Sequence, residues 1–342
     1  MNRQSRLEGE LAERARAEGL VALSISRARP YRNVAVALAE REMAGLRDTM
    51  QFTYRNPARS SDPASTLSEA RSVISAAWPY GPASRGQAPS VVARYARRDS
   101  YAELRKRLGG LAEVLEASGY QARVVADSNA LVDKEPAVRG GGGWYLKNSL
   151  FAVVSHGSMV VLGNVITDAA LAPTRPRLRL TGCGQCTSCM NACPTGAILP
   201  GGAIDAGRCI SWQLQKPGML EHDIASRMGV RVYGCDICQE VCPYNRKLSE
   251  DFADPVQQVE ELSAILAMDD AGLLGRFAHL YLPQRDPSVL RRNALAALGN
   301  VRAEPALEAA RTLLWAWVGN ADPVLAATAL DSLGRLGRAV IG

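Results

Sequence analysis

The 342-residue sequence lacks the hydrophobic runs that mark membrane-spanning and exported proteins. None of its apolar stretches approaches the roughly 18 residues that a membrane-spanning helix needs. Residues 1–10 are polar and mixed in charge, so they contain no apolar core of a signal peptide. These absences predict a cytoplasmic protein without membrane segments.

A large excess of charge of one sign is also missing. The formal net charge is +6, with 47% hydrophobic and 22% charged residues. This is the balance of an ordinary globular protein that can bury a core, and the length predicts two or three domains. The modest positive charge is compatible with a nucleic-acid partner but does not require one.

Cysteine is absent outside one short segment. All eight cysteines lie between Cys183 and Cys242, and none occurs elsewhere. In a cytosolic chain of this size, such clustering favours a metal site over disulfide bonds.

The spacing of the cysteines is that of a bacterial ferredoxin. The first run, C-x2-C-x2-C-x3-C-P, comprises Cys183, Cys186, Cys189, Cys193 and Pro194. Three cysteines of such a run bind one 4Fe–4S cluster, and the fourth binds the neighbouring cluster. The second run, from Cys235 to Pro243, lacks its first cysteine, which leaves Cys209 to supply that ligand.

The swapped arrangement assigns every cysteine. The ligands expected for cluster one are Cys183, Cys186, Cys189 and Cys242. Those expected for cluster two are Cys193, Cys209, Cys235 and Cys238. Structural zinc and disulfides are the alternatives, but this spacing and the two Cys-Pro steps are not typical of zinc ribbons.

Residues 1–172 are predicted to form one α+β domain. Apolar spacing predicts helices over 5–19 and 101–118 and strands over 21–26, 71–78 and 122–126. Gly119 is expected to end the second helix. The apolar runs 150–154 and 159–166, joined by a short polar turn, predict a hairpin.

The remaining chain is divided into residues 173–247, which carry the cysteines, and residues 248–342, which are predicted to be helical. Asp286 and Asp322 each precede a proline, a typical helix start. The two helices are expected to end at Leu298-Gly299 and Leu333-Gly334, 35 residues apart. This repeat is similar to a pair of HEAT-like repeats, with a plain helical bundle as the alternative.

Several motifs resemble those of the epoxyqueuosine reductase family. They are Asp205-x2-Arg208-Cys209-Ile210-Ser211, the run 231–245, the segments 92–96 and 290–300, and Asp127-Ser128, Gly143-Trp144 and Lys147-Asn148-Ser149. The resemblance extends over about residues 70 to 300. The chain departs from the family pattern at Leu146 (usually Gly), at Asp133-Lys134 (usually Glu-Arg) and at Asn164 (usually Glu).

The resemblance implies a fold and an activity. The expected fold is a nitroreductase-like cobalamin-binding domain, a ferredoxin-like double 4Fe–4S domain and C-terminal HEAT-like repeats that help to hold tRNA. The expected cofactors are cobalamin and two 4Fe–4S clusters. The expected reaction is reduction of the epoxide of epoxyqueuosine to queuosine at the wobble position of tRNA. A flavodoxin or ferredoxin would supply the electrons, and the protein is expected to be a monomer.

The resemblance also implies roles for individual residues. Asp127 matches the proton donor of the family and follows the strand 122–126, where burial would raise its pKa. A helix cap or a surface turn is the alternative. The cofactor-binding candidates are Arg94, Tyr95, Asp127, Trp144, Lys147, Asn148, Ser149 and Ser211.

The candidates for tRNA contact are basic residues, because arginine suits phosphate. They are Arg246, Lys247, Arg291 and Arg292, and a solvated basic face is the alternative. His156 and His222 are not expected to bind cobalt, because the family leaves cobalt without a protein histidine. The competing functions are a cobalamin-dependent reductase of a small molecule, related to the reductive dehalogenases, and a non-enzymatic iron–sulfur electron carrier.

Overall fold

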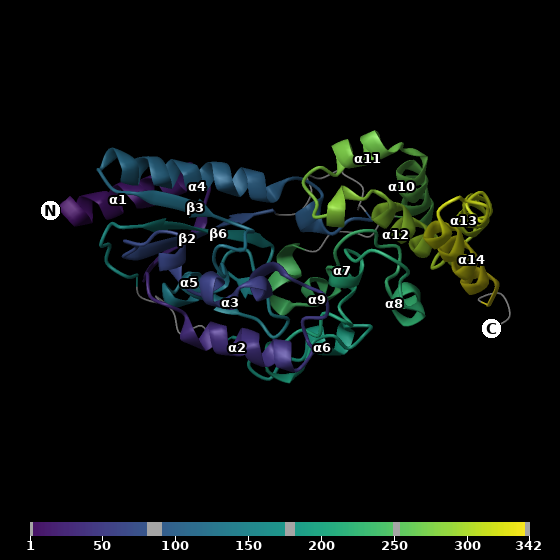
Figure 1. Cartoon of the computed structure of the whole chain (residues 1–342), viewed down its shortest axis with the longest axis horizontal. Helices are drawn as coiled ribbons and strands as arrows, with labels where there is room; N and C mark the ends of the chain where they lie inside the picture. The colour runs from purple at the N-terminus through teal and green to yellow at the C-terminus, as the bar shows by residue number, and fades with distance from the viewer. Residues whose placement is uncertain (1–2, 81–90, 175–181, 249–253, 339–342) are drawn as a thin grey trace.

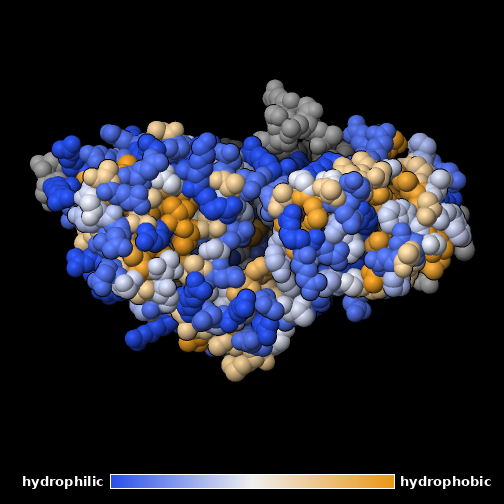
Figure 2. All heavy atoms as spheres, turned by 45° about the horizontal axis from the view of Figure 1, so that its top comes forward, coloured by the Kyte–Doolittle hydropathy of each residue, from blue (hydrophilic) through white to orange (hydrophobic). Residues whose placement is uncertain are grey.

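The computed structural model describes residues 3–80, 91–174, 182–248 and 254–338. A part that contains the main sheet and a helical part lie at opposite ends of the molecule, with the cysteine segment between them (Figure 1). Figure 2 shows a mostly hydrophilic surface with small hydrophobic patches and a recess where the two parts meet. Among the described helices, none has both the length and the apolar character needed to cross a membrane.

Four antiparallel strands form the central sheet in the order β1-β2-β6-β3. They are β1 (Val21–Arg27), β2 (Ser72–Pro79), β6 (Val160–Thr167) and β3 (Ala122–Val125). Strand β6 pairs on both sides, so Asn164 lies opposite Ser75 of β2 and opposite Val125 of β3. This register brings the end of β3 next to a polar position in the centre of the sheet.

Two long helices cover one face of the sheet. Helix α1 (Arg3–Ala17) packs beside α4 (Ser100–Ala117), and their leucines form one hydrophobic core with the sheet. Gly119 follows α4 in the left-handed conformation, with φ +87°. The two helices and three strands expected in this region are confirmed within two residues at each end.

Shorter elements lie on the opposite face (Figure 1). They include α2 (Arg32–Met43), α3 (Pro57–Ser60) and α5 (Lys134–Arg139); the 3-10 turns η1 (Phe52–Arg55) and η2 (Pro63–Ser65) flank α3 in sequence, and η3 (Arg94–Ala96) leads into α4. The hairpin expected between 150–154 and 159–166 is wrong. Strand β5 (Phe151–Ala152) pairs with β4 (Trp144–Tyr145), whereas β6 joins the central sheet, because its buried apolar side chains complete the core there.

The cysteine segment consists of short elements. They are α6 (Ser188–Ala192), η4 (Pro200–Gly202), α7 (Ile210–Gln213), α8 (His222–Arg227), α9 (Ile237–Glu240) and η5 (Pro243–Leu248). Helices this short leave most backbone N–H groups without helical partners. Those groups are therefore available to the sulfur atoms around them.

The C-terminal part is helical, as expected. Its elements are α10 (Pro255–Ala267), α11 (Asp270–Arg276), η6 (Pro283–Arg285), α12 (Ser288–Leu298), α13 (Ala306–Trp315) and α14 (Pro323–Arg338). Asp322 accepts a hydrogen bond from the Val324 backbone at the start of α14, which confirms that cap. The cap expected at Asp286 is wrong by one residue, because α12 begins at Ser288 with Pro287 at its N-cap, although Asp286 accepts from the Ser288 N–H. The helix end expected at Leu333-Gly334 is wrong, because the fully buried Leu336 holds a further turn of α14 in the core.

One hydrophobic core connects the helical part to the rest of the molecule. It contains side chains of α10, α12, α13 and α14 together with apolar residues from 210–233 and 91–96. The second half of the cysteine segment is therefore packed as part of the helical bundle, and this packing fixes its position relative to the sheet.

Candidate functional site

The eight cysteines are free thiols that form two groups in space. In the first group, Cys189 interacts electrostatically with Cys183 and Cys242, and Cys242 also interacts with Cys186. In the second group, Cys209 interacts with Cys193, and both Cys235 and Cys238 interact with Cys209. Cys242 therefore lies with the first sequence run, and Cys193 lies with the second.

The surroundings of both groups fit iron–sulfur clusters. The backbone N–H groups of Lys147 and Ala197 donate to the Sγ atoms of Cys183 and Cys193, each at 3.3 Å. Such N–H···S contacts help to set the potential of a bound cluster. No three described His, Cys, Asp or Glu side chains meet closely enough for a single metal ion. A donor set of four thiols is instead the set that a 4Fe–4S cube takes.

The turn between β4 and β5 reaches both groups of thiols. Lys147 Nζ donates to the carbonyl oxygens of Gly184 at 2.8 Å and Cys186 at 3.0 Å. The buried Asn148 side chain donates to the carbonyl of Cys238 at 3.4 Å. Two residues expected to hold cobalamin therefore also attach the sheet-containing part to the cysteine loops.

Two neighbours of this turn complete it. Ser149 has a left-handed φ of +62°, and its carbonyl accepts a hydrogen bond from Lys134 Nζ at 2.7 Å. The buried Trp144 packs with Cys183 and Cys242, and its indole N–H has no hydrogen-bond partner among the described residues. This N–H is a buried donor available to a cofactor.

The segment 94–95 lies against the second group of thiols. The Arg94 backbone N–H donates to Asp236 Oδ2 at 2.7 Å, and its guanidinium lies 3.9 Å from Glu240. A Cβ atom on Gly234 would lie 3.1 Å from the Tyr95 ring, so this position needs glycine for close approach as well as for its φ of +72°. Tyr95 also interacts with Asp127, and so lies between the second group and that carboxyl.

The other cofactor candidates divide into two kinds. The backbone N–H of Ser211 reaches the Cys209 thiol from the start of α7, beside the second group. His156 contacts Ser155 at 2.7 Å, and His222 contacts Asp331 at 3.2 Å.

Asp127 ends β3 in a strained conformation. Its φ is +50°, which a residue with a side chain rarely adopts. The side chain contacts solvent, yet desolvation by the surrounding protein raises its pKa. Asp99 raises that pKa further, and Arg105 opposes the shift.

Three phenols lie within electrostatic reach of the Asp127 carboxyl. Tyr95, Tyr101 and Tyr233 each interact with Asp127, and burial raises the pKa of each above its usual value. They therefore stay neutral near pH 7. The arrangement combines a carboxyl of raised pKa with neutral phenols and nearby thiols.

Behind Asp127 lies a second carboxyl that sequence reasoning missed. Asn164 Nδ2 donates to Asp133 Oδ1 at 2.9 Å, and Ser75 Oγ donates to Asn164 Oδ1 at 2.6 Å. The backbone N–H of Asp127 also bonds to the Asp133 carboxyl. Burial, followed by the charge of Asp127, raises the pKa of Asp133 to about 8. In the sequence, positions 133 and 164 are both departures from the expected family pattern, but nothing there shows that the two residues meet.

The expectation that Arg292 contacts tRNA is wrong. Its side chain is only 1% exposed and donates to the carbonyl oxygens of Lys216 and Gly218 at 2.5 and 2.6 Å. The turn that follows α7 presents several carbonyl groups in one place, and the guanidinium satisfies them. Its position in the core leaves no surface for a phosphate.

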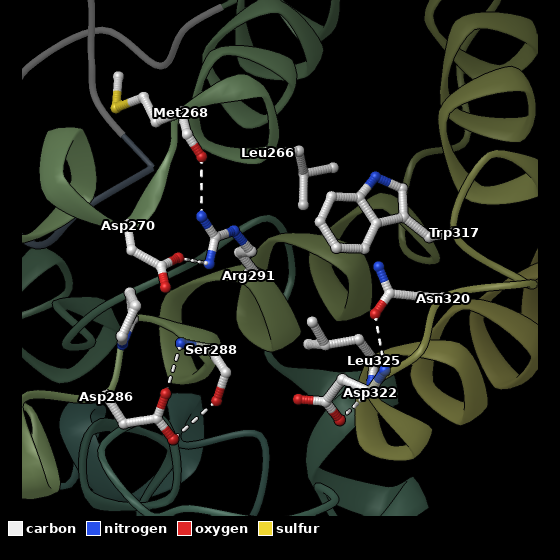
Figure 3. Close-up of a pocket in the computed structure, with 11 residues that line it drawn as sticks. Leu266, Met268, Asp270, Asp286, Ser288, Arg291, Trp317, Asn320, Asp322 and Leu325 are labelled. Carbon is white, nitrogen blue, oxygen red and sulfur yellow. Dashed lines mark hydrogen bonds and ion pairs between the residues drawn. The ribbon is translucent and has the colours of Figure 1, made fainter.

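The other basic candidates differ in exposure. Arg291 is held by Asp270 and by the carbonyl of Met268, at 2.5 and 2.8 Å (Figure 3). It lines a cavity of about 470 Å³ between the C-terminal helices, together with Leu266, Met268, Asp270, Asp286, Pro287, Ser288, Trp317, Asn320, Asp322 and Leu325. Arg246 has an exposed side chain on η5, whereas the Lys247 side chain lies outside the described residues.

Two family models match the chain. The 4Fe-4S double cluster binding domain matches residues 182–245, and the model for epoxyqueuosine reductase QueG matches residues 60–128. The first covers all eight cysteines, and the second ends one residue after Asp127.

Similar proteins share most of the chain. An epoxyqueuosine reductase of Lactococcus garvieae is 31% identical over 317 residues, which cover 88% of this chain and 89% of that protein. The one of Bacillus subtilis is 32% identical over 70% of this chain and 63% of its own.

Solved structures agree with the sequence comparison. The epoxyqueuosine reductase of Streptococcus thermophilus has a TM-score of 0.84 at 28% identity, covering 97% of this chain and 90% of that one. Another epoxyqueuosine reductase, solved with an epoxyqueuosine-modified tRNA stem loop, has a TM-score of 0.83 at 27% identity, covering 97% and 91%. From this similarity across nearly its whole length, the chain belongs to the epoxyqueuosine reductase family.

Proposed function

We propose that this chain is an oxidoreductase that reduces the epoxide of epoxyqueuosine to the alkene of queuosine at the wobble position of tRNA. The observation that carries the proposal is the Asp127 carboxyl, with its raised pKa, beside a segment that gathers eight thiols in two groups. Membership of the epoxyqueuosine reductase family supports it. So does the related structure that holds an epoxyqueuosine-modified tRNA stem loop.

The reaction consumes two electrons and two protons and releases the epoxide oxygen as water. Asp127 is the group that gives a proton to the departing oxygen. An acid for this step must be protonated near neutral pH, and burial raises the pKa of Asp127 in that direction. The phenols of Tyr95 and Tyr101, whose pKa values burial raises, stay neutral beside it.

Two 4Fe–4S clusters, when bound by the eight cysteines, would supply the electrons. Cluster one takes Cys183, Cys186, Cys189 and Cys242, and cluster two takes Cys193, Cys209, Cys235 and Cys238. The electrostatic contacts among the thiols support this division. Tyr95 lies between the loop of cluster two and Asp127, which supports cluster two as the one nearer the substrate. A flavodoxin or ferredoxin supplies the electrons.

Cobalamin binds beside Asp127, between the phenols and the turn that follows β4. When bound, it supplies a low-valent cobalt that is both a strong reductant and a strong nucleophile. The aromatic walls suit a large flat ring, and the unpartnered N–H of Trp144 is a donor of the kind that ring substituents accept. Lys147, Asn148, Ser149, Arg94, Tyr95 and Ser211 are the other residues proposed to surround it.

The three parts of the chain divide the work. Residues 1–172 form a nitroreductase-like domain for cobalamin, 173–247 form the ferredoxin-like domain, and 248–342 form HEAT-like repeats that hold tRNA. The stacking of α12 against α14 and α13 supports the repeat assignment. Exposed Arg246, with Lys247 and Arg291, contributes phosphate contacts in a monomeric enzyme.

Mass spectrometry of tRNA tests this function. A strain that lacks the gene should accumulate epoxyqueuosine and contain no queuosine. Complementation with the parent gene should restore queuosine, and complementation with Asp127→Asn should not. Normal queuosine in the deletion strain would exclude the proposed substrate.

A further inference from the structure

The three residues Ser75, Asn164 and Asp133 form a chain of hydrogen bonds that ends at the backbone of Asp127. None of them belongs to the acid, to the thiol groups or to the residues proposed to surround cobalamin. Ser75 and Asn164 are both fully buried, at 0% exposure. Buried polar side chains need hydrogen-bond partners, and here the series of partners leads to the backbone of Asp127.

The register of the sheet fixes the first two members. Ser75 and Asn164 face each other across β2 and β6, and Ser75 Oγ donates to Asn164 Oδ1 at 2.6 Å. The oxygen end of the Asn164 amide therefore faces Ser75. Its Nδ2 donor must then point toward Asp133, whose Oδ1 accepts it at 2.9 Å.

Asp133 in turn holds the backbone of Asp127. Its carboxyl accepts the N–H of Asp127, so it spans the five residues between them and closes them into a loop. The loop has a reason to need this support, because a left-handed φ of +50° at a residue with a side chain costs on the order of 1 kcal/mol or more. Without the acceptor, Asp127 is expected to relax to an ordinary conformation.

We propose that Asp133 is a positioning residue that holds the Asp127 loop in its working conformation, and that Ser75 and Asn164 orient Asp133. The proposal rests on the proposed role of Asp127 as the acid. It assigns a function to Asp133 and Asn164, which hydrogen-bond to each other across the end of the sheet. The carboxyl at 133 and the amide at 164 complement each other as acceptor and donor.

The key variant exchanges the two side chains. In Asp133→Asn/Asn164→Asp, the new amide at 133 donates to the new carboxylate at 164, which still accepts from Ser75. The amide oxygen at 133 remains free to accept the N–H of Asp127. The exchange therefore keeps every hydrogen bond of the chain but removes the acidic proton from position 133. The single variants Asp133→Ala and Asn164→Ala each break the chain.

Hydrogen–deuterium exchange measures how well the backbone amides of the loop are protected. In both single variants, amides 127–130 should exchange at least ~10 times faster than in the parent, while α4 stays equally protected. The rate constant kcat should fall by ~10- to 100-fold with little change in KM for tRNA, because misplacing an acid affects chemistry more than binding. The double variant Asp133→Asn/Asn164→Asp should recover most of the protection of amides 127–130 and most of kcat. Glu10→Gln, which removes only an exposed ion pair with Arg6 on α1, should match the parent.

Two results would overturn the proposal. If exchange at 127–130 is unchanged in Asp133→Ala, the carboxyl does not hold the loop. If the double variant Asp133→Asn/Asn164→Asp carries both clusters but has a kcat as low as that of the single variants, the proton of Asp133 matters rather than its hydrogen bonds. The exchange measurement needs no turnover, so it stays informative even if epoxyqueuosine is not the substrate.

Discussion

Arg292 donates a hydrogen bond of 2.6 Å to the backbone carbonyl of Gly218. The bond joins α12 of the helical part to the turn after α7. Helix α7 begins directly after Cys209, a cysteine proposed to bind cluster two. The same guanidinium reaches Lys216, and neighbouring Asn293 donates to Leu214 and Val232. The helical part therefore holds the cysteine segment in place through polar contacts as well as through its core.

Replacing Arg292 should affect stability and not tRNA affinity. Arg292→Ala leaves several buried carbonyls without donors, which should lower the free energy of unfolding by about 3 kcal/mol. Denaturant unfolding measures this change, and binding to tRNA at low salt should be unchanged for the folded fraction. Arg246→Gln is the matched control on the exposed surface. It should weaken binding and reduce its dependence on salt, with no change in stability.

A loss of tRNA affinity in folded Arg292→Ala, equal to that in Arg246→Gln, would contradict this assignment. It would mean that the turn 213–218 itself contacts tRNA.

Replacing Cys242 should damage cluster one, although Cys242 belongs to the second sequence run. The reconstituted parent should hold about eight iron atoms per chain, and Cys242→Ser should lose iron from the cluster bound by the first run. Electron paramagnetic resonance of the reduced protein distinguishes the two clusters. Cys193→Ser is the reciprocal control and should damage cluster two. Loss of only the cluster bound by Cys235 and Cys238 in Cys242→Ser would reverse the assignment.

Asp127→Asn should fold, bind both clusters and bind tRNA, but lose most of its turnover. The amide keeps the shape of the carboxyl and cannot supply its proton, and general acids typically contribute ~10²- to 10⁴-fold in rate. Single-turnover kinetics with epoxyqueuosine-containing tRNA measures the chemical step. Turnover close to that of the parent would exclude Asp127 as the acid and leave water or a phenol as the donor.

Stability should depend on pH through Asp133. Burial raises the pKa of this carboxyl to about 8, above the value of about 4 in an unfolded chain. A carboxyl with a raised pKa favours the folded state at low pH, and this contribution is lost as the pH rises from about 4 to about 8. The charge of Asp127 adds to the upward shift of this pKa, whereas the hydrogen bonds from Asn164 and from the Asp127 backbone, and the charge of Lys134, oppose it.

The difference in Tm between the parent and Asp133→Asn measures this contribution. The parent should lose stability relative to the variant across that pH interval and level off above it. A difference that stays constant from pH 5 to pH 9 would show that Asp133 ionises normally.

The sequence by itself determined the elements that depend on local pattern. Cysteine spacing predicted how eight thiols divide between two clusters, since Cys183, Cys186 and Cys189 lie in one run and the fourth cysteine of such a run binds the neighbouring cluster. Apolar periodicity predicted α1 and α4, because the leucines on one face of each helix have only the sheet to pack against. Asp127 was found from its motif and its place at the end of a strand.

Only the tertiary structure decided which polar side chains meet. Arg291 and Arg292 are adjacent and equally basic in the sequence, yet helix geometry turns one toward a cavity and buries the other among carbonyl groups. Likewise, Asn164 and Asp133 lie 31 residues apart, and nothing local pairs them. Their hydrogen bond exists because β6 lies between β2 and β3, and the order of strands in a sheet is set by the packing of the whole core rather than by any one segment.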